Sequence, residues 1–162
     1  MARRDPRTRL LLQILDEAFT ARGWQGATLS GALRGLSVRQ ALWRPGPGRH
    51  NIWELVLHAA YWKHVVRQRV EGAGRTPFPR GPRNYPDLPV RRDAAAWRAD
   101  VALLKQEHAA MTRTVRGLKP GRLDAPVRRS PWTVGEQIFG VAAHDLYHTG
   151  QIQLLKALQR GR

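Results

Sequence analysis

Two stretches rich in proline and glycine restrict the regular structure of the 162-residue chain to the segments on either side of them. One runs from residue 75 to residue 89 and the other from residue 117 to residue 131. Proline lacks a backbone N–H and its ring clashes with the preceding helical turn, so neither stretch can be regular helix. A shorter break of the same kind, Pro45-Gly46-Pro47-Gly48, precedes residue 50.

Between these breaks lie four long segments with the signals of amphipathic helices, because apolar residues recur along one face at helical spacing. The second segment begins with Asn51 and has Glu54 three residues later, and the fourth begins with Thr133 and Glu136, the pattern of a capping box. No segment alternates like a strand. We predict long helices over residues 6–22, 51–71, 93–117 and 133–159, and short helical turns over residues 30–36 and 37–42.

Four helices of this length predict an all-α protein with a four-helix bundle. The proline-rich stretch between the second and third helices is long enough to run the length of the bundle. We therefore predict a long crossover that sets these two helices parallel. A length of 162 residues with 42% hydrophobic residues fits one domain and one core, which we expect to span residues 1–162.

The composition excludes several classes of site. The chain has no cysteine, which rules out disulfides, thiolate metal ligands and a cysteine nucleophile. No stretch approaches the ~20 apolar residues that a membrane span needs, and the first residues do not read as a signal peptide. We expect a soluble, cytoplasmic protein.

The net charge of +16 implies attraction to anions such as nucleic acids, acidic small molecules or acidic surfaces. Two interpretations follow: contact with nucleic acid, or a solvated basic surface that keeps the protein soluble. The second is favoured, because the arginines are scattered and no nucleic-acid-binding signature is present.

His144 and His148 are four residues apart in the last predicted helix. On a helix they would lie ~40° apart in azimuth and ~6 Å apart along the axis, so both rings can reach one metal ion. The pair by itself is a weak signal, since six histidines in 162 positions give roughly 0.2 such pairs by chance. Position 145 is Asp, so the glutamate of a zinc-protease motif is missing.

His58 strengthens the case, because it lies on the apolar face of the second predicted helix. A single histidine on such a face is more often a satisfied core residue than a ligand. Three imidazoles buried without partners would be costly, however, and neighbouring helices lie close enough for their side chains to converge. We predict that His58, His144 and His148 hold a divalent metal ion.

Other residues are expected near the site. Gln151 follows His148 by one helical turn and is predicted to orient a ligand or line the pocket. Trp62 and His108 are further candidates for the pocket, and Tyr147 is expected to pack rather than react.

Two histidines are expected to lie outside the site. His50 precedes the cap of the second helix and is expected to be exposed. His64 is ~240° around that helix from His58 and should face away.

Three sequence elements resemble the DinB/YfiT-like metalloenzymes of the DinB superfamily. They are NIWELVLHAAYW over residues 51–62, SPWTVGE over residues 130–136 and HDLYHTGQI over residues 144–152, in the family's order and spacing. The resemblance covers essentially the whole chain. It implies a four-helix bundle with a divalent metal, most often zinc or nickel, held by three histidines, which here are His58, His144 and His148.

The resemblance also implies a range of activities. Members include transferases and isomerases that use low-molecular-weight thiols, and proteins induced by DNA damage, while many have no assigned reaction. Many are dimers, so a homodimer is expected. The net charge of +16 departs from a typical member.

Three neutral ligands leave a metal ion with its full charge and an open position, as in catalytic zinc sites. Water or a substrate thiol could take that position, and a thiol must come from the substrate because the chain has no cysteine. We therefore expect a hydrolase or a low-molecular-weight-thiol transferase, with no catalytic residue assigned. The alternative is a basic, DNA-damage-related binding protein in which the metal is structural or vestigial. A third possibility is that the histidines only fill the core.

Overall fold

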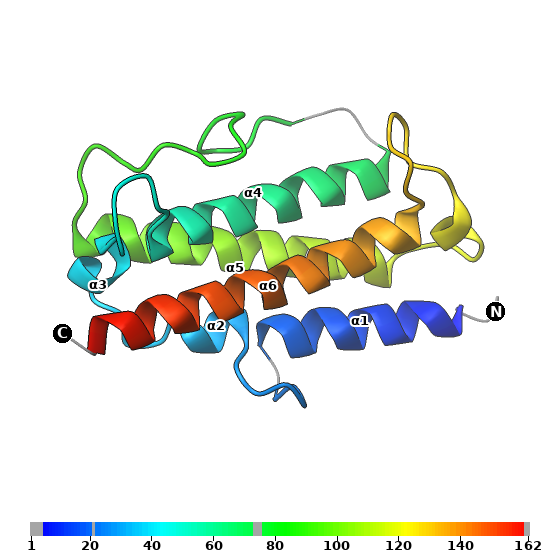
Figure 1. Ribbon diagram of the computed structural model, residues 1–162. Helices are drawn as coiled ribbons and strands as arrows, with labels where there is room; N and C mark the ends of the chain where they lie inside the picture. The colour runs from blue at the N-terminus through cyan, green and yellow to red at the C-terminus, as the bar shows by residue number, and fades with distance from the viewer. Residues whose placement is uncertain (1–4, 21, 73–75, 161–162) are drawn as a thin grey trace.

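A computed structural model describes residues 5–20, 22–72 and 76–160. Its regular structure is helical, and the described residues form no strand beyond two isolated β-bridges. The elements in chain order are α1 (Pro6–Phe19), α2 (Leu29–Ala32), α3 (Val38–Leu42), α4 (Ile52–Glu71), α5 (Ala94–Arg116), the 3-10 helix η1 (Arg122–Asp124) and α6 (Val134–Arg160). The four long helices α1, α4, α5 and α6 lie side by side (Figure 1), which confirms the all-α bundle.

The direction of the helices confirms the predicted crossover. In Figure 1, α4 and α5 run the same way, and α1 and α6 run the opposite way. The segment after α4 returns along the outside of the bundle before α5 begins. We call its described part, residues 76–93, the crossover. No helix in the described part of the chain is long and apolar enough to span a bilayer.

The predicted capping signals set the starts of α4 and α6. The Asn51 side chain accepts a hydrogen bond from the Glu54 backbone N–H at 2.9 Å, and Glu54 accepts one from the Asn51 N–H at 3.1 Å. Thr133 and Glu136 make the same reciprocal pair at the start of α6. Each pair satisfies N–H groups that a helix start leaves without partners.

The first helix is shorter than predicted. We expected it to reach residue 22, but α1 ends at Phe19 and Thr20 has left the helical conformation. Two glycines, Gly23 and Gly26, pair across a tight turn just beyond it. Gly26 has a φ of 98°, which other residues rarely adopt, so the turn rather than the apolar spacing decides where the helix stops.

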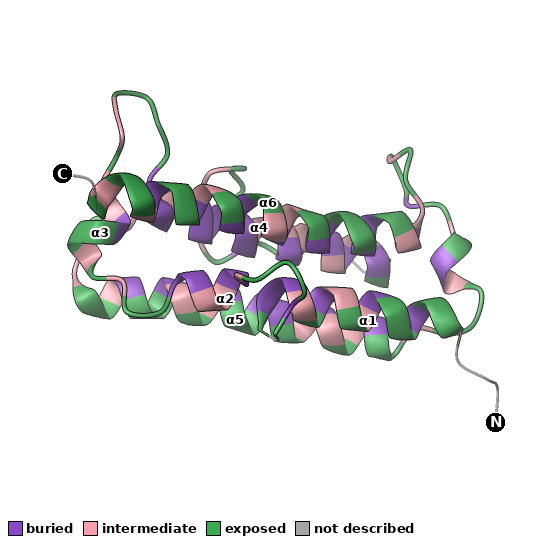
Figure 2. Cartoon of the chain, turned by 60° about the horizontal axis from the view of Figure 1, so that its bottom comes forward, coloured by how far each residue is buried: buried purple, intermediate pink, exposed green. Residues whose placement is uncertain are grey.

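The core lies between the long helices. Figure 2 shows buried residues along the sides on which the helices face one another, and exposed residues on the outer sides. One apolar cluster surrounds Trp53 and a second surrounds Met111. Burying each large apolar side chain stabilises the fold by about 1.5–3 kcal/mol.

One charged pair is buried in this core. Lys63 of α4 and Asp145 of α6 form an ion pair in which both side chains are 0% exposed. Lys63 Nζ also lies 5.0 Å from the centroid of the Phe19 ring. Because Asp145 is next to His144 in the chain, this pair fixes α4 against α6 beside the predicted metal site.

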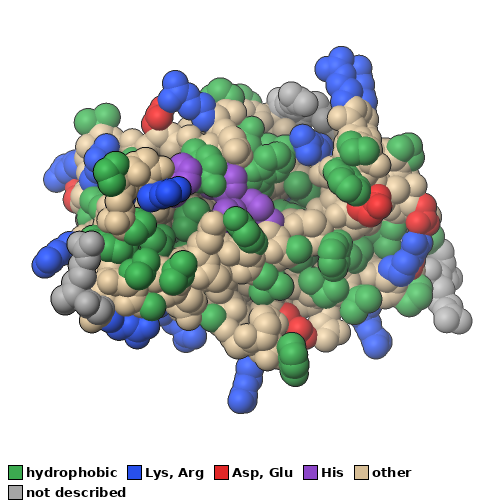
Figure 3. All heavy atoms as spheres, viewed as in Figure 1, with side chains coloured by type: hydrophobic (Ala, Val, Ile, Leu, Met, Phe, Trp, Pro, Cys, Tyr) green, Lys and Arg blue, Asp and Glu red, His purple; other side chains and the backbone are tan. Residues whose placement is uncertain are grey.

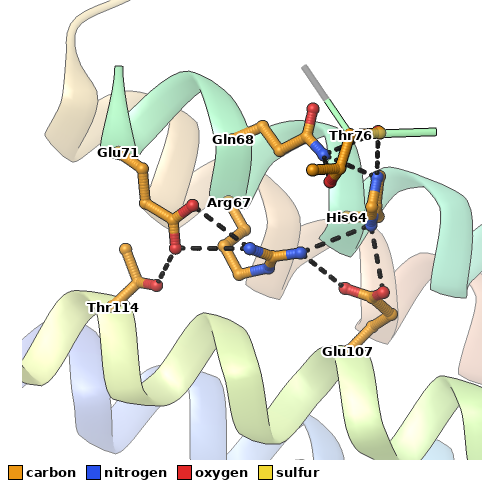
Figure 4. A network of polar contacts seen from close by, with 7 residues as sticks. All are labelled: His64, Arg67, Gln68, Glu71, Thr76, Glu107 and Thr114. Atoms are coloured by element: carbon orange, nitrogen blue, oxygen red, sulfur yellow. Dashed lines mark hydrogen bonds and ion pairs between the residues drawn. The ribbon is translucent and has the colours of Figure 1, made fainter. Parts of the chain in front are cut away.

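A polar network at the C-terminal half of α4 holds the start of the crossover (Figure 4). The two ring nitrogens of His64 face oxygen atoms, at 3.0 Å from Glu107 Oε1 and 2.9 Å from the Thr76 carbonyl. Gln68 donates to the same carbonyl at 2.8 Å. His64 therefore points to α5 and the crossover, away from His58, as predicted.

A second anchor holds the middle of the crossover. Arg80 donates to Asp100 Oδ1 of α5 at 2.8 Å, and Trp53 Nε1 of α4 donates to Asp100 Oδ2 at 2.8 Å. Asp100 is fully buried, so water does not compete for the carboxylate that accepts these hydrogen bonds. These two sets of hydrogen bonds hold the crossover in place along α4.

Candidate metal centre

Three imidazole rings converge between α4 and α6. His144 Nε2 lies 3.0 Å from His58 Nε2 and 2.9 Å from His148 Nε2. All three atoms lie within 4.8 Å of one another, and no other histidine, aspartate or glutamate group in the described residues has this geometry. The spacing of four residues places His144 and His148 on one face of α6, and packing brings His58 of α4 to the same point.

Hydrogen bonds on the far side of two rings fix which nitrogen is protonated. His58 Nδ1 lies 2.8 Å from the carbonyl oxygen of Asn84, and His148 Nδ1 lies 2.6 Å from Gln151 Oε1. Both oxygens are acceptors, so each Nδ1 donates its proton. Each Nε2 then carries a lone pair that points at His144 Nε2.

The surroundings keep all three rings neutral. Burial lowers the pKa of His58 to about 4, although its hydrogen bond to Asn84 opposes the shift. Burial, then the neighbouring His148 and His58, lowers the pKa of His144 to about 3. Burial also lowers the pKa of His148, against the opposing bond to Gln151. Neutral imidazole is the form that binds a metal ion.

This arrangement fits a cation. A proton on His144 Nε2 can be donated to only one of the two facing lone pairs, and His144 Nδ1 is buried without a hydrogen-bond partner. A cation at the centre would satisfy all three nitrogens at once. Nitrogens bound at 2.0–2.1 Å to a tetrahedral ion are about 3.3 Å apart, which is within a few tenths of an ångström of both separations from His144 Nε2.

The sequence model of the DinB superfamily matches residues 23–152. The chain belongs to the DinB superfamily. The matched region includes His58, His144 and His148. Comparisons with curated proteins and with solved structures gave no match.

Of the predicted neighbours in this DinB-superfamily protein, Gln151 and Trp62 lie at the site. The Gln151 side chain accepts the hydrogen bond from Nδ1 of the predicted ligand His148. The Trp62 ring stands edge-on to His58 and to His144, with centroid distances of 6.5 and 6.3 Å.

His108, the third predicted neighbour, lies elsewhere in the core. Its ring stacks on Phe19 of α1 at 3.9 Å. Burial, then the nearby Lys63, lowers the pKa of His108 to about 3. α5 turns this residue towards α1 rather than towards the three histidines.

The crossover supplies residues that sequence reasoning missed. Besides the Asn84 carbonyl, which receives the His58 proton, the Asn84 side chain accepts a hydrogen bond from Trp62 Nε1 at 2.7 Å. Tyr85 stacks on His58 with a centroid distance of 4.1 Å. No sequence signal marks these residues, because their contact with α4 depends on the path of the crossover.

The site lies just below one face of the molecule, with His58 and His148 buried and His144 partly exposed. Figure 3 shows histidine side chains at the surface on the face formed by α4 and α6, with hydrophobic side chains around them. Acidic side chains on this face lie away from the histidines, whereas a Lys or Arg side chain lies beside them. A ligand can therefore approach the histidines past an apolar rim.

Proposed function

We propose that this protein is a divalent-metal-dependent enzyme, either a hydrolase or a low-molecular-weight-thiol S-transferase. His58, His144 and His148 are the metal ligands, and zinc or nickel is the ion. The observation that carries the proposal is that three neutral imidazoles converge on one point. The nitrogens that meet there carry fewer protons than lone pairs, so hydrogen bonds among them cannot satisfy them all. Membership of the DinB superfamily supports it.

An ion held by three neutral ligands keeps its charge and acts as a Lewis acid towards water or a thiol. The protein's own residues orient the ligands and shape the approach. The Asn84 carbonyl and Gln151 hold the Nδ1 protons of His58 and His148, so each Nε2 stays available. Trp62 and Tyr85 pack against the His58 ring and help to hold it in place. Any thiol must come from the substrate, because the chain has no cysteine.

Elemental analysis of untagged protein tests this function. We expect about one zinc or nickel per chain, and loss of that metal in His144→Ala. His50→Gln is the matched control, since it removes a histidine that is not a proposed ligand and should keep the metal. Wild-type protein that takes up neither metal after incubation would contradict the proposal.

With the metal identified, hydrolysis of p-nitrophenyl acetate and transfer of glutathione to 1-chloro-2,4-dinitrobenzene are the first activity assays. Turnover of only one probe that depends on the identified metal assigns the reaction class.

The alternative function is nucleic-acid binding with a structural metal, which rests on the net charge of +16. It predicts binding that weakens steeply with salt and is unaffected by His144→Ala. A duplex titration at low and physiological salt, with both proteins, tests it.

A further inference from the structure

His50 lies beside the metal site without belonging to the ligand set. Its ring stacks on one face of Tyr85 with a centroid distance of 3.8 Å and an interplanar angle of 3°. The other face of Tyr85 stacks on the proposed ligand His58 at 4.1 Å and 9°. Only the thickness of one aromatic ring separates His50 from His58.

Glu54 determines the orientation of the His50 ring. Glu54 Oε2 lies 3.1 Å from His50 Nδ1. Burial opposes ionisation of Glu54, but its hydrogen bonds with Arg44, Asn51 and His50 prevail and lower its pKa. An ionised carboxylate only accepts hydrogen bonds, so Nδ1 carries the proton and Nε2 is the nitrogen free to exchange one. Glu54 is itself fixed by the capping box of α4.

His50 is close to the site and also open to solvent. Its side chain is 46% exposed, so a proton that it takes up can pass to solvent.

The other titratable groups near the site are poorly suited to proton transfer. Asp145 is fully buried and paired with Lys63. Burial, then Tyr147 and Glu54, raises the pKa of Tyr85 above its usual value of 10.0. Glu54 is held by Arg44 at 2.8 Å. Tyr147 is also exposed and lies beside the site, with its ring centroid 5.0 Å from that of His148, but no carboxylate of the described residues bonds its hydroxyl. His50 combines a free nitrogen, an orienting carboxylate and access to solvent.

We propose that His50 is the general acid–base residue of this site and that Glu54 is its positioning residue. The proposal rests on the proposed metal-dependent function. The O–H or S–H bond of water or a thiol at the site breaks as an N–H bond forms at His50 Nε2, through an intervening water molecule. The carboxylate of Glu54 stabilises the resulting imidazolium, which then releases one proton to the buffer. A leaving group is protonated by the same steps in reverse.

Thiol binding to cobalt(II)-substituted protein tests the proton transfer without an identified substrate. The probe is 2-mercaptoethanol, and the readout is the rate at which the sulfur-to-cobalt charge-transfer absorbance appears in stopped flow. We expect His50→Gln to slow this step by about 10²-fold, with one cobalt still bound per chain, and added imidazole to restore the rate. Arg49→Gln is the control, because it removes a neighbouring positive charge but no proton carrier.

Ring ¹⁵N spectra of metal-free protein test the positioning role of Glu54. We expect neutral His50 to carry its proton on Nδ1 in the wild type, and Glu54→Gln to reduce that preference and to slow thiol binding less than His50→Gln does.

Three results would overturn the proposal: an unchanged rate in His50→Gln, a rate that imidazole fails to restore, or loss of cobalt from that variant. Failure of the proposed function looks different, because then the wild type itself would bind no cobalt.

Discussion

The buried pair of Lys63 and Asp145 leads to a quantitative prediction about stability. Both side chains are 0% exposed, and Asp145 Oδ1 is buried without a hydrogen-bond partner. Asp145→Asn keeps the shape of the side chain but leaves the ammonium group of Lys63 in the core with no anionic partner among the described residues. Breaking a buried ion pair in this way costs about 3–5 kcal/mol. For a chain of this size that is a fall in Tm of roughly 6–20 °C.

Replacing both residues should behave differently. The pair leaves one carboxylate oxygen unsatisfied, so its attraction offsets the cost of desolvation only in part. We expect Lys63→Met with Asp145→Leu to lie within about 1 kcal/mol of the wild type, or above it, and above either single variant.

The assay is urea unfolding of the four metal-free proteins, followed by circular dichroism. The single variant Lys63→Met has a further signature, because burial raises the pKa of Asp145 and the lone carboxyl can neutralise itself by binding a proton. Its folded-state pKa then lies above the unfolded value, so its destabilisation should lessen as the pH falls. Losses below about 1 kcal/mol in Asp145→Asn, as for a surface pair, would refute the reasoning.

Three other predictions concern the site and the helix caps. Gln151→Leu removes the acceptor of the His148 Nδ1 proton, so the metal affinity measured by chelator competition should fall about 10–100-fold. An unchanged affinity would show that Gln151 only packs. The metal-free protein should lose stability as the pH falls below 6.5. Histidines of the unfolded chain bind protons in that range, whereas folding lowers the pKa of His58 to about 4 and that of His108 to about 3. A melting temperature that stays constant between pH 7 and pH 5 would contradict this. Asn51→Ala should cost about 1 kcal/mol in urea unfolding, and no loss would mean that the cap is dispensable.

The sequence by itself determined the features that depend on local periodicity. The capping pairs at Asn51 and Thr133 marked the starts of α4 and α6, because the groups that satisfy a helix start lie within one turn of it. The spacing of His144 and His148 fixed their common face for the same reason. His58 could be added because its apolar neighbours showed which side of α4 faces inward.

Only the tertiary structure decided what surrounds those three histidines. Asn84 and Tyr85 reach His58 because distant side chains anchor the crossover along α4, and no local pattern encodes such a path. His50 is exposed, as expected, but its stacking on Tyr85 depends on the same path of the crossover. His108 was assigned to the correct helix, but the packing of α5 against α1 places its ring on Phe19. Helical periodicity gives the direction of a side chain from its own axis, whereas the partner that it meets depends on how the axes pack.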